Sequence, residues 1–562
     1  MRTRSFLLIS SAVVVAAAAA GAAEPKFEVG TAPGQQTRGA RLGAPEMRLS
    51  LQDAITTALA HNINLEVSRL SLASAQQGLL GSTGIFDPQV KSALGASYYE
   101  AQSTNELVGA NVALERGREF DLSLGGLVAT GGSYSVGWTN SRSKTNSSFY
   151  FLNPSYSSGL TFALTQPLMK GFGTDVTRTG IEVARRSRDI SAVQFEEIVI
   201  NTAQAVESAY WNLVYAIDNL KAKQHSLMLA QDLLKETQAR VRIGTSAPID
   251  IIQSEAAVAA REVDIIVAEN AVGNAGDVLK GLLGFENPDD WTSTIIPTDA
   301  LEGAAEHVDL DRSIAEAIAK RPELRQRQLE LEIGQANLLA ARSGARPQLD
   351  LALTYGYAGV GGDSTVYDPQ TGKVISYTPG GWSDALRQIR DRSYNQWTAM
   401  VNFSYPLGNH QAKAQVAQDR FAVTTARQNI ALQRQGVIED VRNAVRGLDA
   451  SGKAILAAVK SRELAERNLD AEQKKFANGM STNFQVVKIQ DDLAAAQAAE
   501  LQSRVLYRQA EATYKVAVGT FLESLGIAIQ PGPQPKEPHT ALEDVRWLKY
   551  GRQPATGAAA AN

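Results

Sequence analysis

The longest hydrophobic pattern in the chain is helical. Residues 181–243 contain neither Gly nor Pro, and their apolar positions recur at steps of three, four and seven residues, as in a coiled-coil seam. At about 1.5 Å per residue this segment predicts a helix of roughly 95 Å. Gly244 and Pro248 interrupt the pattern, which resumes to about Leu283. We therefore expect a long helical hairpin.

A second hairpin is predicted further along the chain. Helix-compatible sequence runs from about Ala412 to Ala477, turns at Gly479 and continues to Val518 without Gly or Pro. Long helices with one apolar stripe owe their stability to packing of that stripe. We therefore expect these helices to pack on each other and on neighbouring chains.

Three segments alternate between apolar and small or polar residues, as strands with one apolar face do. They are residues 160–164, 349–357 and 397–405, with Tyr and Trp near their ends. Such strands are typical of a membrane-spanning β-barrel, but they also fit a sandwich that covers a periplasmic core. Alternation alone does not separate these two interpretations.

Further alternation between residues 118 and 142, across Gly131 and Gly132, predicts an additional β-hairpin. This hairpin could add strands to a barrel, fold over the mouth of the barrel or lie in an equatorial belt around the helical part of the molecule. The stretches 101–118, 139–157 and 359–395 are rich in Gly, Ser and Asn. We expect them to form long polar loops.

The two halves of the chain share one order of landmarks. Residues 49–90 align without gaps onto residues 308–349, which pairs Leu51 with Leu310. Later, ARVRIGTSAPIDII aligns with KKFANGMSTNFQVV and pairs Gly244 with Gly479. The sequence therefore predicts an internal repeat, with one folding plan used twice.

The N-terminus has the pattern of a secretory signal. Arg2 and Arg4 precede an apolar run over residues 6–20, and small residues follow at 20–23. The run is shorter than the ~20 residues that span a bilayer, so we expect cleavage rather than a membrane anchor. With no cysteine in the chain, neither lipidation at the mature N-terminus nor a disulfide framework is expected.

Charge and motifs argue against several functions. The net charge of −4 offers no basic face for nucleic acid. The five histidines are scattered, and HExxH, GxSxG and phosphate-loop motifs are missing from the sequence. We therefore predict no catalytic residues, no metal site, no cofactor and no nucleic-acid partner.

Five motifs in order carry a family resemblance. They are LSLQDAITTALAHNINLEV (49–67), TQPLMKGFG (165–173), AYWNLVYAIDNL (209–220), RVRIGTSAPIDIIQSEA (240–256) and ATYKVAVGTFLESLGI (512–527). Over roughly residues 48–530 the chain resembles the TolC-like outer-membrane factor family. The resemblance implies a homotrimer in which each protomer gives about four strands to a shared transmembrane β-barrel, continuous with a long periplasmic α-helical barrel. Four strands alone would leave open edges in lipid, which agrees with a trimer.

The resemblance also implies a functional site at the hairpin turns. There a periplasmic adaptor protein would bind and open the tip, and an inner-membrane transporter of the RND, ABC or MFS type would supply the energy. A gate constriction is implied at Asp250, Gln485 and Lys488. Family members often carry acidic residues here, so Gln485 and Lys488 put a cation-selective ring in doubt, although Asp491 and Asp492 lie about one turn further on. The implied adaptor contacts are Gly244, Thr245, Ser246, Ala247, Pro248, Gly479, Met480, Ser481 and Thr482.

The predicted layout is an α+β membrane protein, exported to the outer membrane of a Gram-negative-type cell with a large periplasmic portion. By the resemblance, we expect the protein to act as a passive export duct in contact with outer-membrane lipid. The alternative is a secreted coiled-coil stalk or adhesin with a non-membrane β head. The expected segments are 1–23 signal peptide, 24–47 flexible segment, 48–284 first repeat, 285–307 equatorial linker, 308–530 second repeat and 531–562 disordered tail.

Overall fold

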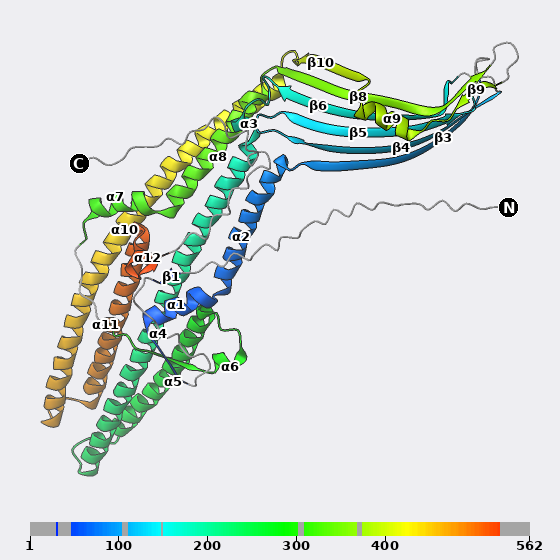
Figure 1. The fold of residues 1–562 in the computed structure, drawn as a ribbon. Helices are drawn as coiled ribbons and strands as arrows, with labels where there is room; N and C mark the ends of the chain where they lie inside the picture. The colour runs from blue at the N-terminus through cyan, green and yellow to red at the C-terminus, as the bar shows by residue number, and fades with distance from the viewer. Residues whose placement is uncertain are drawn as a thin grey trace, which may run out of the picture.

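The computed structural model describes residues 30–31, 46–103, 111–147, 150–301, 308–367 and 374–528. The predicted signal peptide, most of the predicted flexible segment, residues 302–307 of the predicted linker and the predicted C-terminal tail lie outside the described residues. A curved antiparallel sheet forms one end of the molecule, and long helices run from it toward the opposite end (Figure 1).

Both predicted helical hairpins are confirmed. Helix α4 (Thr179–Arg242) pairs with α5 (Ile249–Leu283), and α10 (His410–Ala477) pairs with α11 (Asn483–Val518). Helix α4 has 64 residues, which at ~1.5 Å per residue is about 95 Å. The two hairpins lie side by side, with their turns at the end remote from the sheet (Figure 1).

In each half of the chain, the segment that precedes the strands forms two helices with a break between them. The first break is at Asn62, whose side chain accepts hydrogen bonds from the N–H groups of Asn64 and Leu65. The second break is at Arg321, where Pro322 starts the next helix. Both breaks fall at the offset that pairs Leu51 with Leu310. The four helices are α1 (Leu51–His61), α2 (Ile63–Thr83), α7 (Leu310–Lys320) and α8 (Pro322–Gly344).

The large sheet follows the order β10-β8-β6-β5-β4-β3, with β9 paired to β8. The predicted strands lie in β6, β8 and β10. The additional hairpin forms β4 and β5 and lies inside the sheet, between β3 and β6. Among the described residues, the main path of this sheet therefore has six strands, two more than the four or so per protomer that the resemblance implied. The bounds are β3 (Gln89–Gln102), β4 (Val112–Leu127), β5 (Ser133–Thr145), β6 (Leu152–Pro167), β8 (Gln348–Tyr367), β9 (Val374–Thr378) and β10 (Asn395–Ser404).

The prediction of three long polar loops is wrong for most of their length. Strand β4 begins at Val112, β5 continues to Thr145 and β6 begins at Leu152. The stretch 359–395 contains the end of β8, all of β9 and helix α9 (Trp382–Arg390). Backbone ladders hold these strand ends together even though their side chains do not alternate in polarity. Residues 104–110, 148–149 and 368–373 lie outside the described residues.

The two faces of the sheet differ in polarity. Directly opposed residues share a face, and one such row joins Leu122, Trp138, Leu160 and Tyr357. The adjacent row, on the other face, joins Asp121, Thr139, Gly159 and Ala358. Large apolar side chains on the first face are exposed, with Leu94 at 82 % and Phe403 at 68 %. No second sheet covers this face in the part of the chain that the structure describes, so the sandwich interpretation finds no support there.

Between the sheet and the turns, a buried core joins α1, α4 and α5 to the parallel pair β2 (Glu46–Leu49) and β7 (Thr294–Pro297). Tyr210 of α4 is fully buried in it. Its hydroxyl donates to Asp299 Oδ2 at 2.7 Å and accepts the N–H groups of Thr298 and Asp299, each at 3.2 Å. The Asp299 carboxylate also accepts the N–H of Leu51 at the start of α1, at 2.7 Å. Burial raises the pKa of Tyr210, so the hydroxyl remains a donor.

Short elements complete this middle region. Residues 30–31, within the segment predicted to be flexible, form β1 (Gly30–Thr31), which pairs with β11 (Ile527–Ala528). The predicted linker contains α6 (Pro288–Trp291) and β7. Helix α12 (Phe521–Ser524) also belongs to this region, whereas the short helices η1 (Gly84–Phe86) and α3 (Thr174–Thr177) lie next to the sheet.

Candidate functional site at the hairpin turns

The two helical turns have the same local geometry. Gly244 has φ +80° and Gly479 has φ +74°, the left-handed conformation that glycine adopts without steric cost. After Gly244, the N–H of Thr245 reaches back to the Arg240 carbonyl at 2.9 Å. After Gly479, the N–H of Met480 reaches back to the Lys475 carbonyl at 2.9 Å. These bonds end each helix as a Schellman-type cap does.

All nine residues predicted as adaptor contacts lie in the two connections between paired helices. Apart from the adjoining residues of the chain, no heavy atom lies within 4 Å of a Cβ built on Gly244 or Gly479. The requirement for glycine therefore comes from the backbone conformation and not from close packing. Contact with an adaptor remains a prediction.

The three predicted gate residues lie close to these turns. Asp250 is in the first turn of α5, and its Oδ2 accepts the N–H of Ala247 at 3.2 Å within the same hairpin. Gln485 and Lys488 are exposed on α11. Asp491, one of the two acids further along α11, forms an ion pair with Arg261 of α5. This acid therefore links two helices of one protomer, which the sequence did not predict.

A buried polar cluster joins the two hairpins next to the turns. We call Thr237 of α4, Ser254 of α5 and Asn483 of α11 the tip cluster, and their exposed fractions are 0 %, 0 % and 2 %. Asn483 Nδ2 donates to Ser254 Oγ at 3.0 Å and to the carbonyl of Asp250 at 3.1 Å. Asn483 Oδ1 accepts from Thr237 Oγ1 at 3.3 Å. One side chain therefore ties the second hairpin to both helices of the first.

A group of apolar residues shares helices α4 and α11 with the tip cluster. Six buried residues from α4, α10 and α11 form one group beside it, and Arg240 lies with its guanidinium carbon 4.3 Å from the ring centroid of Phe476. Cation–π contacts of this kind add to the burial of the ring. The six residues are Leu233, Leu469, Phe476, Val486, Ile489 and Leu493.

The second turn is also held by a buried carboxylate. Glu472 of α10 is 7 % exposed, and it accepts a hydrogen bond from Ser481 and another from Lys475 Nζ at 3.1 Å. The hydrogen bond from Ser481, followed by that from Lys475, lowers the pKa of Glu472. Ser481, predicted from the sequence as an adaptor contact, is thus also part of the internal structure of the turn.

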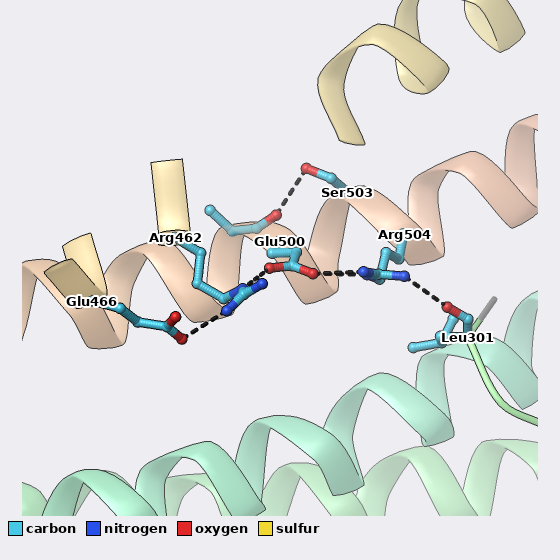
Figure 2. A network of polar contacts seen from close by, with 7 residues as sticks. Leu301, Arg462, Glu466, Glu500, Ser503 and Arg504 are labelled. Carbon is cyan, nitrogen blue, oxygen red and sulfur yellow. Dashed lines mark hydrogen bonds and ion pairs between the residues drawn. The ribbon is translucent and has the colours of Figure 1, made fainter. Parts of the chain in front are cut away.

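Further from the turns, a charged network connects the second hairpin to the middle region (Figure 2). Glu500 of α11 forms ion pairs with Arg462 of α10 and with Arg504, the latter at 2.7 Å. Arg504 Nη1 also donates to the carbonyl of Leu301 at 3.2 Å. Burial alone would raise the pKa of Glu500, but hydrogen bonds from Arg504 and Arg462 outweigh it and lower the pKa. The network fixes α11 against α10 and against the segment after β7.

Metal-binding clusters and membrane-spanning helices are two further kinds of feature that bear on function. Among the described residues, no three His, Cys, Asp or Glu side chains are grouped so that they could hold a metal ion. No helix in the described ranges is both long and apolar enough to cross a membrane.

Residues 129–285 and 313–520 match the family model described as "Outer membrane efflux protein". The chain is 24 % identical over 331 residues to the outer membrane protein TolC of Escherichia coli K12, which covers 58 % of this chain and 62 % of that protein. It is 24 % identical over 339 residues to the pyoverdine export outer membrane protein OpmQ of Pseudomonas putida, covering 59 % of this chain and 66 % of OpmQ.

Solved structures share the fold. The Campylobacter jejuni outer membrane channel CmeC matches with a TM-score of 0.60 at 14 % identity, over 84 % of this chain and 86 % of CmeC. The open state of the Neisseria gonorrhoeae channel MtrE matches with a TM-score of 0.56 at 18 % identity, over 89 % and 97 %. The family model covers more than half of the chain. Both hairpins and the strands from β5 to β10 that form the sheet lie within the matched parts, whereas β3 and β4 precede them. The chain belongs to the outer membrane efflux protein family.

Proposed function

We propose that this chain is one protomer of a passive, trimeric outer-membrane export channel that opens at its hairpin turns. The observation that carries the proposal is the combination of an exposed apolar face and a polar opposite face on one sheet, continuous with helices of about 95 Å. Such a sheet suits lipid on one side and water on the other. Helices of this length suit a duct that crosses much of a periplasm.

The open edges of the sheet support the trimer. Strands β3 and β10 are the ends of the six-strand path, and unpaired backbone groups at an edge are not tolerated in lipid. Further copies of the chain would pair these edges. Three copies of a six-strand path contribute eighteen strands, against the twelve implied by four per protomer, and barrel diameter grows roughly with strand number. We therefore expect a wider barrel than the resemblance implies.

The repeated order of helices and turns supports an internal repeat, in which both halves supply equivalent parts of the wall. The adaptor would contact the two turns, and the constriction would lie beside Asp250, Gln485 and Lys488. An inner-membrane transporter of the RND, ABC or MFS type would drive transport, because the sequence has no phosphate-loop motif with which the channel itself could use a nucleotide. Export by a cleaved signal peptide without lipidation completes the proposal.

The tip cluster suggests how the closed tip is held. To separate the two hairpins, the bonds from Asn483 to Thr237, Ser254 and Asp250 must break. The link to Asp250 uses its main-chain carbonyl, which every substitution at that position keeps. We therefore expect Asp250→Ala to open the channel much less than Asn483→Ala does.

The test is to express the full chain, separate the membranes and purify the protein from the outer-membrane fraction. A trimer that conducts ions in planar bilayers, and a mature N-terminus near Glu24 by mass spectrometry, are expected. A soluble, monomeric mature protein without conductance would overturn the proposal and favour the secreted stalk or adhesin.

A further inference from the structure

Helix α9 lies on the apolar face of the sheet. Gly359 of β8 is directly opposite Ser158 and two residues from Tyr357, so it belongs to the apolar face. A Cβ on Gly359 would lie 2.0 Å from the carbonyl oxygen of Ala385, and Ala385 is fully buried. Only glycine at this strand position allows the helix to approach so closely. Figure 1 shows α9 across this part of the sheet.

Specific contacts fix α9 in this place. Trp382 stacks on Trp138 of β5, with ring centroids 5.9 Å apart and planes inclined by 15°. Trp382 Nε1 donates to Asn140 Oδ1 at 3.1 Å. Gln388 donates to the carbonyl of Val360 at 2.9 Å and accepts its N–H at 3.0 Å. The Gln388 amide therefore pairs with backbone hydrogen-bonding groups at the edge of β8, just beyond the residues that pair with β10.

The level of α9 along the strands corresponds to the edge of the apolar band. On β8 this band extends from Leu349 to Tyr357, which at ~3.3 Å per residue is about 30 Å of strand. A strand tilted by roughly 40° then spans a height of about 23 Å, close to the ~25 Å apolar band of outer-membrane barrels. Trp138, Tyr355 and Tyr357 lie at its outer end, as interfacial aromatic residues do. Helix α9 comes directly after them, remote from the long helices.

The exposed side of α9 is basic. The side chains of Arg387 and Arg390 are 61 % and 74 % exposed, and Arg392 follows on the surface. Asp384 lies 3.6 Å from Arg387, and Asp391 lies 2.9 Å from Arg390. Three arginines against two aspartates leave residues 382–392 with a net charge of +1.

Apolar side chains share the helix with these arginines. Leu386 and Ile389 are half-buried, and the helix is fixed beside the exposed apolar band. An amphipathic helix with a basic edge is suited to lie in the interface and attract anionic headgroups.

We propose that α9 is a membrane-interface helix whose arginines bind the phosphate groups of anionic lipids in the outer leaflet. This inference rests on the proposed membrane channel, because it requires lipid against the apolar face. Leu386 and Ile389 enter the edge of the hydrocarbon region, while Arg387 and Arg390 contact the headgroups. Each arginine near an anionic surface favours binding to it about fivefold over a neutral surface. Because two aspartates offset two of the three arginines, we expect α9 to prefer anionic over neutral lipid roughly fivefold.

Because the chain has no cysteine, single fluorophores can report on chosen positions of the full trimer. We would label Leu386→Cys on α9, Val401→Cys in the apolar band and Ser376→Cys on β9. Each trimer is placed in phosphatidylcholine vesicles with or without phosphatidylglycerol, and is quenched by headgroup-labelled lipid or by aqueous iodide. Lipid quenching at 386 and 401, and iodide quenching at 376, are expected. Anionic lipid should strengthen quenching at 386, and Arg387→Gln with Arg390→Gln should abolish that increase.

The controls separate the two proposals. Iodide quenching at 401 would refute the membrane channel itself. Lipid quenching at 401 but iodide quenching at 386 would refute only the placement of α9 at the interface. An increase at 386 that survives both arginine substitutions would refute the role of the arginines. Inorganic phosphate at the same total concentration should not reproduce the effect of anionic lipid, and if it does, the arginines bind free phosphate and not the lipid surface.

Discussion

The substitution Asn483→Ala should loosen the closed tip of the channel. Asn483 is 2 % exposed and bonds to Thr237, to Ser254 and to the Asp250 carbonyl, at 3.0 to 3.3 Å. A hydrogen bond contributes about 1 kcal/mol net, and a buried group left without a partner costs about 1–3 kcal/mol. Since alanine removes all three bonds, we expect the contact between the hairpins to weaken by about 2–4 kcal/mol. Opening of the turns would then become roughly 30 to 900 times more frequent.

Single-channel recording in planar bilayers measures this effect as the fraction of time in the high-conductance state. Asn478→Ala is the matched control, because Asn478 is exposed on the same hairpin and its amide bonds only to Lys474 O, at 2.8 Å, within its own helix. The control should behave like the wild type. If Asn483→Ala forms a normal trimer whose open fraction equals that of Asn478→Ala, the tip cluster does not hold the channel closed.

Three further substitutions test other contacts. Tyr210→Phe removes a buried hydroxyl and its hydrogen bonds to the Asp299 carboxylate and to the N–H groups of Thr298 and Asp299, so chemical denaturation should show a loss of about 1–3 kcal/mol in the free energy of unfolding, and an unchanged midpoint would contradict this account. Gly479→Ala should lower the free energy of unfolding by about 1 kcal/mol, because alanine is strained at the positive φ of this position. Gly447→Ala, inside α10, should leave that free energy unchanged or raise it in the same chemical denaturation experiment. The pKa of Glu500 is lowered, so its ion pairs stabilise the fold above the unfolded pKa and are lost as pH falls through the folded value. Glu500→Gln should therefore lower the melting temperature at pH 7 and remove part of its decline below about pH 4.5, and equal acid sensitivity of the two proteins would exclude this role.

The helical part of the molecule was largely determined by local sequence. Residues 181–243 lack Gly and Pro, so no helix-breaking residue occurs in this segment before Gly244. There and at Gly479, positive φ angles are local requirements that glycine meets. The turns, and the nine predicted contact residues within them, could therefore be located without knowledge of any neighbour.

The strands were predictable only where one face is apolar. Residues 349–357 alternate clearly, whereas the outer halves of β4, β5 and β6 carry mostly polar or small residues on both faces. Their pairing depends on hydrogen bonds to strands far away in the chain. The same holds for the position of the additional hairpin between β3 and β6.

The tip cluster and α9 were decided by the tertiary structure alone. Thr237, Ser254 and Asn483 resemble ordinary polar residues of a solvated helix in the sequence, and they are buried only because three helices meet there. Helix α9 occurs in a stretch that composition assigned to a loop, and Gly359 and Trp138 hold it on the sheet. Local sequence sets backbone preferences over a few residues, but burial and bonding partners depend on which distant segments pack together.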